Sequence, residues 1–99
     1  MSNARVVLVT GGMGGLGEVI STKMSAAGYR VAVTYSPGNT KHAEWVADMK
    51  ARGHDILAVP CDVADLESCT KAVAEVREKV GEVDVLVNNA GITRDMTFK

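Results

Sequence analysis

A glycine-rich turn directly after a short apolar run constrains the fold of this chain more than any other feature. The run ends at Val9, and the turn that follows is Thr10-Gly11-Gly12-Met13-Gly14-Gly15-Leu16-Gly17. Five of these eight residues are glycine, so bare backbone N–H groups stand where a helix begins. Amides at a helix N-terminus and the helix dipole both favour an anion. The turn therefore predicts a phosphate site between a buried strand and a helix.

Strand-like and helix-like segments alternate along the chain. Strands are expected at residues 5–10, 30–35, 56–60 and 83–87. Helices are expected after the glycine turn, between a cap at Asn39 or Thr40 and Gly53, and between a cap at Asp65 and Gly81. This β-α-β-α-β-α-β order predicts an α/β fold: a Rossmann-type doubly wound parallel sheet with strand order 3-2-1-4.

Two further predictions concern the helices. Trp45 lies on an apolar stripe of the second helix and is expected in the core. The third helix has an inward stripe with helical spacing, made of Leu66, Cys69, Val73, Val76 and Val80.

The first and fourth strands are neighbours in this strand order, and their connections leave in opposite directions. Ligands bind outside the carboxyl ends of such strands. The glycine turn and a second loop, Asn88-Asn89-Ala90-Gly91, both fall there, which favours a dinucleotide site. The fourth strand leaves an apolar edge open, so residues 1–99 are expected to be the cofactor-binding part of a longer single-domain protein, without its C-terminal half.

Composition excludes several classes. A net charge of −1, no basic cluster and 4% aromatic residues argue against a nucleic-acid partner. No apolar stretch reaches membrane-spanning length. We expect a cytoplasmic protein. We also expect no metal site. Cys61 and Cys69 are interpreted as buried reduced thiols rather than a redox pair, and His42 and His54 as exposed residues without a catalytic role.

The loop after the second strand predicts the cofactor. An acidic residue there binds the adenosine ribose hydroxyls of NAD, but residues 35–40 include none, and Lys41 follows. A hydroxyl at Ser36 and a cation at Lys41 suit the 2′-phosphate of NADP(H); the alternative is that Lys41 is simply solvated. An ATP-binding P-loop is excluded, because Glu18 stands where its lysine would follow the last glycine.

Catalytic residues are not found in this stretch. Reduction of a carbonyl needs a proton donor, usually a Tyr with a Lys four positions later. Tyr29 is followed at that spacing by Val33, and Tyr35 by Asn39. Asp62, after the third strand, is open to two interpretations: it accepts a hydrogen bond from an adenine amino group, or it caps the following turn.

Three motifs in order, Thr10-Gly11-x-x-x-Gly15-x-Gly17, Asp62-Val63 and Asn88-Asn89-Ala90-Gly91, resemble the short-chain dehydrogenase/reductase family over essentially the whole chain. Within the family, the Gly-Gly-Met-Gly-Gly turn and the Gly-Ile-Thr-Arg-Asp loop look like those of NADPH-dependent acetoacetyl-CoA reductases of polyhydroxybutyrate synthesis. The 3-oxoacyl-acyl-carrier-protein reductases share that loop but less of the turn.

The resemblance implies a role for each matching position. Residues of the turn would line the pyrophosphate, Lys41 would meet the 2′-phosphate, and Asp62 with Val63 would hold adenine. Asp95 would border the substrate entrance. The full set of implied cofactor-binding residues is Gly11, Met13, Gly14, Gly15, Leu16, Gly17, Ser36, Lys41, Asp62, Val63, Asn89, Ala90, Gly91, Ile92 and Thr93.

The resemblance also implies the reaction. A homotetramer would reduce acetoacetyl-CoA to an (R)-3-hydroxyacyl-CoA with NADPH, using catalytic Asn, Ser, Tyr and Lys residues beyond residue 99. A 3-oxoacyl-acyl-carrier-protein reductase and a non-catalytic NADP-binding module are the alternatives.

Overall fold

The computed structural model describes residues 5–11, 13–62 and 64–89. The strands are β1 (Val6–Val9), β2 (Arg30–Tyr35), β3 (Leu57–Pro60) and β4 (Val83–Val87). They form one parallel sheet in the order β3-β2-β1-β4, which confirms the predicted topology. The helices are α1 (Gly15–Ala26), α2 (His42–Ala51) and α3 (Leu66–Lys79).

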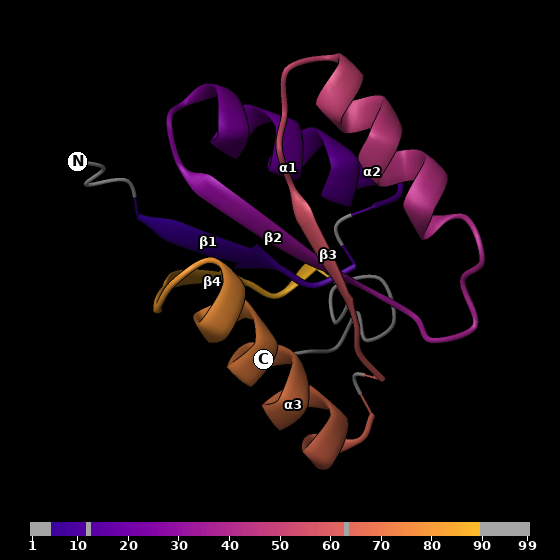
Figure 1. The fold of residues 1–99 in the computed structure, drawn as a ribbon. Coiled ribbons are helices and arrows are strands. Elements are labelled where there is room, and N and C mark those ends of the chain that lie inside the picture. Colours follow the sequence, from indigo (N-terminus) through magenta and orange to yellow (C-terminus); the bar gives the residue numbers. More distant parts are fainter. Residues whose placement is uncertain (1–4, 12, 63, 90–99) are drawn as a thin grey trace.

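The helices cover the sheet from both sides, with α1 and α2 on one face and α3 on the other (Figure 1). Right-handed crossovers require this arrangement, because the chain reverses its direction of travel across the sheet between β3 and β4. Two apolar clusters result. Val7 and Val9 pack on the α1–α2 side with Met49, whereas Val6 and Leu8 pack on the α3 side with Val76.

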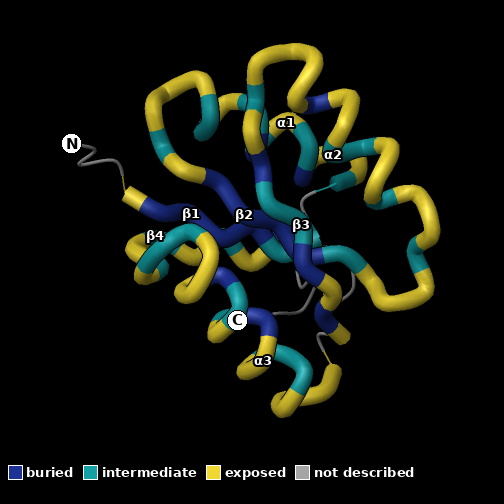
Figure 2. The backbone as a smooth tube through the Cα atoms, viewed as in Figure 1, coloured by how far each residue is buried: buried dark blue, intermediate teal, exposed yellow. Residues whose placement is uncertain are grey.

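The central strand β1 is more deeply buried than the edge strand β4 (Figure 2). All of β1 is buried, because helices cover both its faces and strands flank both its edges. The edge strand β4 alternates between half-buried and exposed residues, and Leu86 is 61% exposed. Among the described residues, no helix is long and apolar enough to cross a membrane.

The helix ends match the predictions in part. Asp65 caps α3 as expected, with its Oδ1 accepting from the Glu67 N–H at 3.0 Å. For α2 the expected cap was wrong: the N-cap is Lys41, whose N–H donates to Asn39 Oδ1 at 2.7 Å, two residues earlier in the chain. The inward stripe of α3 was also wrong at its first residue, since Leu66 is 82% exposed: it lies at the end of the helix, beyond the packed cluster.

An irregularity marks the start of β4. Val6 pairs with Val83 and Val7 with Val85, so Asp84 is an extra residue at this point of the β1–β4 ladder. Its Oδ2 accepts from the Val6 N–H at 2.9 Å. The extra residue reverses the alternation: Val83 packs on the α3 side, and Val85 on the α1–α2 side.

Candidate functional site

The glycine turn joins β1 to α1 with its backbone open to a ligand. Gly11 has φ +62° and Gly15 φ +50°, conformations that side chains with a Cβ rarely adopt. No side chain caps α1 at Gly14. A Cβ added at Gly14 or Gly15 would meet nothing within 4 Å. The start of α1 therefore has open space at Gly14 and Gly15, while the Gly17 N–H already donates to the Gly14 carbonyl at 2.9 Å.

The loop after β4 is tied to this turn, as the topology predicted. Thr10 donates its N–H to the Val87 carbonyl at 3.0 Å, and its Oγ1 lies 3.2 Å from Asn88 Oδ1. Asn89 is buried and donates its Nδ2–H to the Gly11 carbonyl at 3.0 Å. Asn89 Oδ1 is also buried, and within the described part of the chain it has no hydrogen-bond partner.

A buried threonine of β2 supports the same turn, and sequence analysis missed it. Thr34 Oγ1 accepts from the Gly11 N–H at 3.0 Å. Thr34 is only 2% exposed, and the other buried residues of β2, Val31, Ala32 and Val33, are apolar. A lone hydroxyl at the carboxyl end of a buried strand is the signal that could have identified it, because a buried hydroxyl needs a hydrogen-bond partner.

The loop after β2 carries the residues predicted to choose the cofactor. Ser36 and Lys41 are both exposed, and no acidic residue lies between them. The Tyr35 ring stacks on the His42 ring, with centroids 4.2 Å apart and planes 7° from parallel. His42 is thus half-buried rather than exposed as expected, and its Nδ1 lies 3.3 Å from the Asn39 carbonyl oxygen.

Asp62 follows β3 at the same edge of the sheet. Its Oδ1 accepts from the Ala64 N–H at 3.0 Å, so the turn-capping interpretation is confirmed. Its N–H donates to Ser68 Oγ at 2.9 Å, which ties the turn to α3. The side chain is exposed. The contact with adenine stays a prediction.

The structure describes some of the other predicted cofactor-binding residues and not the rest. Met13 is half-buried against the α1–α2 cluster, Leu16 is 56% exposed, and Gly17 is buried. The remaining calls lie outside the described residues: Val63, Ala90, Gly91, Ile92, Thr93 and Asp95.

A dinucleotide phosphate fits the arrangement. The N-terminus of α1 carries no side-chain cap and has open space at two glycines, which suits a bound anion. No acid or base positioned for catalysis is found among the described residues of this edge. Tyr35 stacks on His42, and Tyr29 lies at the opposite end of β2.

Sequence analysis also missed a contact that fixes α1 against α2. Trp45 is half-buried rather than fully in the core, and its Nε1–H donates to Glu18 Oε1 at 2.9 Å. Arg52 Nη1 lies 3.9 Å from Glu18 Oε2. Glu18, the residue that excludes a P-loop, therefore connects the two helices.

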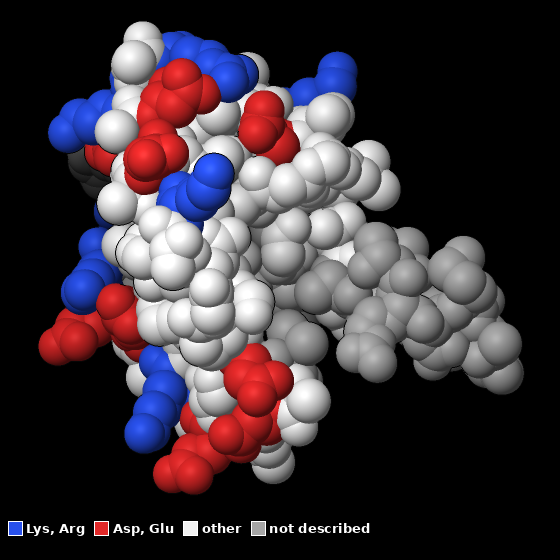
Figure 3. Space-filling model, turned by 90° about the vertical axis from the view of Figure 1, so that its right-hand side faces the viewer, with Lys and Arg blue, Asp and Glu red and all other residues white. Residues whose placement is uncertain are grey.

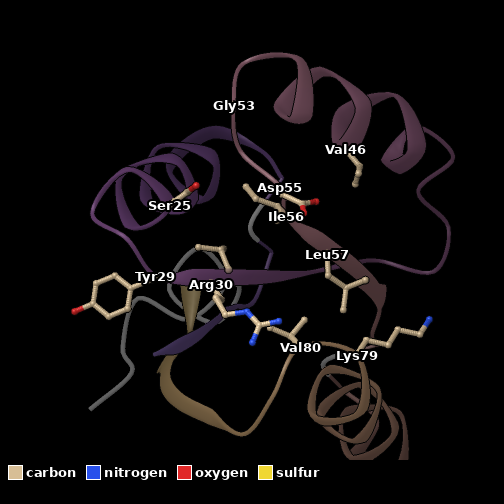
Figure 4. A pocket seen from close by; sticks show the side chains of 11 residues that line it. Ser25, Tyr29, Arg30, Val46, Gly53, Asp55, Ile56, Leu57, Lys79 and Val80 are labelled. Atoms are coloured by element: carbon tan, nitrogen blue, oxygen red, sulfur yellow. The ribbon is translucent and has the colours of Figure 1, made fainter. Parts of the chain in front are cut away.

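A cavity of about 620 Å³ lies at the opposite edge of the sheet, where β2 and β3 begin (Figure 4). Arg30, Asp55 and Lys79 are among its lining residues. Because open parallel sheets bind ligands outside the carboxyl ends of their strands, we do not assign the nucleotide site to this cavity. On the face seen in Figure 3, acidic and basic side chains are mixed, without one large patch of either sign.

No group of three or more His, Cys, Asp or Glu side chains suited to a metal ion occurs in the described ranges. His54 is half-buried, not exposed as expected, and its Nδ1 lies 2.8 Å from Ser25 Oγ.

Known proteins are similar to this chain in sequence and in fold. The chain is 44% identical over 95 residues to an acetoacetyl-CoA reductase of Cupriavidus necator, covering 96% of this chain and 39% of the relative. It is 41% identical over 95 residues to a 3-oxoacyl-[acyl-carrier-protein] reductase of Staphylococcus aureus, with the same coverage. A solved structure of an actinorhodin polyketide ketoreductase with NADPH superposes with a TM-score of 0.81 at 33% identity, covering 90% of this chain and 34% of that one.

The chain spans about two fifths of the length of these curated relatives. The family model of the short chain dehydrogenases matches residues 5–99. With the strand order and the glycine turn at the switch point of the sheet, this match identifies the chain as a member of the short-chain dehydrogenase/reductase family of oxidoreductases.

Proposed function

We propose that this chain is the NADPH-binding part of a reductase that converts acetoacetyl-CoA into (R)-3-hydroxybutyryl-CoA. The observation that carries the proposal is the uncapped N-terminus of α1 beneath the open space at Gly14 and Gly15. Amides of this turn would hold the pyrophosphate, and Thr34 and Asn89 would keep the turn in position through Gly11. When bound, NADPH supplies the hydride that reduces the 3-keto group.

The loop after β2 supports NADPH rather than NADH. An NAD site uses a carboxylate near this position to bind the ribose hydroxyls, and the same carboxylate would repel a 2′-phosphate. This loop offers the Ser36 hydroxyl and the Lys41 ammonium group, both exposed. The stack of His42 on Tyr35 holds the first turn of α2, next to Lys41, against the end of β2.

The adenine end of the site is assigned by position and by resemblance. Asp62 leaves β3 at the edge where the glycine turn lies, and its exposed carboxylate would accept a hydrogen bond from the adenine amino group. Val63 would contact the ring, and residues 89–93 would flank the ribose and nicotinamide. Asp95 would border the substrate entrance.

Substrate and assembly are proposed from the relatives. One relative is named as an acetoacetyl-CoA reductase and is slightly more similar than one named as an acyl-carrier-protein reductase, at 44% against 41% identity. This difference favours CoA, with the carrier-protein thioester of fatty acid synthesis as the second candidate. We also propose a cytoplasmic homotetramer whose catalytic Ser, Tyr and Lys lie outside residues 1–99, in a pathway to polyhydroxybutyrate.

The cofactor is tested with Lys41→Gln and a matched control, Lys50→Gln. Both lysines are exposed and belong to α2 or its cap, but only Lys41 borders the loop after β2. Lys41→Gln is expected to weaken NADPH binding about fivefold, the size of one exposed ion pair of about 1 kcal/mol, and to leave NADH binding unchanged. Ser36→Asp should shift preference toward NADH. Equal effects of both Lys variants on NADPH would contradict the assignment.

The reaction is tested by assaying the intact protein with acetoacetyl-CoA and with acetoacetyl-acyl-carrier protein, using NADPH. A higher kcat/KM for the CoA thioester supports the proposal, and a higher value for the carrier thioester favours the second candidate. NADPH binding without turnover of either substrate would favour a non-catalytic module. Light scattering of the same sample gives the number of subunits.

A further inference from the structure

The turn between β3 and α3 places two sulfur atoms side by side. Cys61 follows β3 directly, and Cys69 lies on the first turns of α3. The two Sγ atoms are 3.5 Å apart, and the Cys61 S–H donates toward Cys69. Both cysteines are free in the structure. Cys61 is buried as expected, whereas the same expectation was wrong for Cys69, which is half-buried because it lies near the exposed start of α3; the two sulfurs form a pair that was not predicted.

Only a small movement would join the two sulfurs. A disulfide has an S–S distance of about 2.0 Å, so the Sγ atoms would need to approach by about 1.5 Å. Hydrogen bonds tie Asp62, the residue after Cys61, to the segment that leads into α3. Its N–H donates to Ser68 Oγ, and its Oδ1 accepts from the Ala64 N–H. These contacts keep the sulfurs in proximity, which favours an intramolecular reaction over one between molecules.

The two thiols are not equivalent. Cys61 is 5% exposed, and its burial and then its hydrogen bond to Cys69 raise the pKa of its thiol to about 11. Cys69 is half-buried and is therefore the more accessible of the two sulfurs. Both cysteines line a cavity of about 230 Å³ on the α3 side of the sheet. A small oxidant in this cavity would therefore react first at Cys69.

We propose that Cys61 and Cys69 are an oxidation site, which a peroxide converts into an intramolecular disulfide between β3 and α3. This inference does not depend on the proposed function. In the first step the Cys69 thiolate attacks a peroxide oxygen; an S–O bond forms, the O–O bond breaks, and the leaving oxygen takes up a proton. In the second step the Cys61 sulfur attacks Cys69 Sγ; the S–S bond forms, the S–O bond breaks, and water leaves with the Cys61 proton. The two thiols give up two electrons, and the peroxide is reduced.

The disulfide would also change the turn beside it. The Cys69 S–H now lies 3.7 Å from the Asp62 carbonyl oxygen, and oxidation removes this weak donor. A ring closed from residue 61 to residue 69 would contain Asp62 and the cap Asp65. Oxidation therefore replaces two weak contacts, between the sulfurs and from Cys69 to the Asp62 carbonyl, by one covalent link.

The sequence provides a direct assay on the intact protein. Trypsin cleaves after Arg52 and Lys71, so both cysteines lie in the single peptide of residues 53–71. After treatment with hydrogen peroxide and then an alkylating reagent, we expect this peptide to be lighter by two hydrogen atoms and to carry no alkyl group. Dithiothreitol should restore two alkylatable thiols. The Cys61→Ser variant should lose the disulfide.

A second variant tests whether the native geometry is responsible. Cys69→Ser combined with Thr70→Cys keeps two thiols in the same peptide but moves one sulfur to the next, exposed position of α3. Disulfide formation should be about tenfold slower or more, because the sulfurs are no longer aligned. Equal rates in this variant and the wild type would overturn the proposal. So would a wild-type peptide that gains oxygen atoms, links to another peptide, or keeps two free thiols.

Discussion

Replacing three glycines one at a time separates backbone strain from the approach of a ligand. Gly14 has φ −128°, which any residue adopts, whereas Gly15 has φ +50° and Gly28, at the other end of α1, φ +102°. A Cβ at any of the three meets nothing within 4 Å. The protein itself therefore offers no steric reason against Gly14→Ala, and only backbone strain acts against Gly15→Ala and Gly28→Ala.

The expected stabilities follow from these angles. Gly14→Ala loses some N-cap preference but restricts the unfolded chain, so its free energy of unfolding should stay within about 0.5 kcal/mol of wild type. Gly15→Ala should lose about 1–2 kcal/mol, because alanine is forced into the left-handed region. Gly28→Ala should lose a similar amount for the same reason. Urea unfolding of the intact protein measures all three.

The expected affinities for NADPH rank the three variants differently from their expected stabilities. If a pyrophosphate lies above Gly14 and Gly15, a methyl group at either position overlaps it at a cost of about 1–3 kcal/mol, or about fivefold to 150-fold in the Kd of NADPH. Gly28→Ala should bind NADPH as wild type does. A fluorescence titration with NADPH would refute the reasoning if Gly14→Ala bound as tightly as wild type, or if Gly28→Ala lost as much affinity as Gly15→Ala.

Three other substitutions have expected outcomes. Asp65→Ala removes the cap of α3 and should lower the unfolding free energy by about 1 kcal/mol in urea, whereas Asp55→Ala, in the loop before β3, should change it much less. Trp45→Phe leaves Glu18 without its indole donor and should cost about 1 kcal/mol; if Trp45→Phe in a Glu18→Ala background cost the same, the contact would contribute nothing. The pKa of Cys61 is about 11 in the folded protein against 9.0 when unperturbed, so the folded state holds this proton more tightly. Stability should therefore fall as pH rises from about 9 through 11, by up to about 2 kcal/mol, and Cys61→Ser should flatten this decline in unfolding experiments.

The strand order and the position of the glycine turn could be predicted because they depend on local pattern and chain direction. Four apolar runs separated by helices permit few right-handed arrangements, and in the predicted order the loops that begin at Thr10 and Asn88 fall at one edge. The N-cap of α3 at Asp65 could likewise be predicted from the sequence, because its side chain bonds the N–H of Glu67, two residues later in the chain.

Contacts between elements could not be predicted in this way. The partner of Trp45 is Glu18, 27 residues earlier, and sequence periodicity contains no information about which residues of α1 and α2 meet. The cysteine pair depends on how β3 turns into α3. Cys61 follows a strand and Cys69 lies in a helix, so no single period relates the two positions. Leu66 was misassigned because periodicity continues to the end of a helix, whereas packing stops where the sheet stops.

The extra residue at the start of β4 has a consequence at the far end of the strand. Sliding a strand by one residue exchanges its faces, which would turn Val85 and Val87 away from their cluster and Asn89 away from the Gly11 carbonyl. Asp84 opposes such a slip, because its carboxylate accepts from the Val6 N–H only in the native pairing. A sheet with β4 shifted by one residue would lose both the Asp84–Val6 hydrogen bond and the Asn89–Gly11 hydrogen bond. Asp84 thus stabilises the strand register on which the Asn89 contact depends, although Asp84 lies at the opposite end of β4.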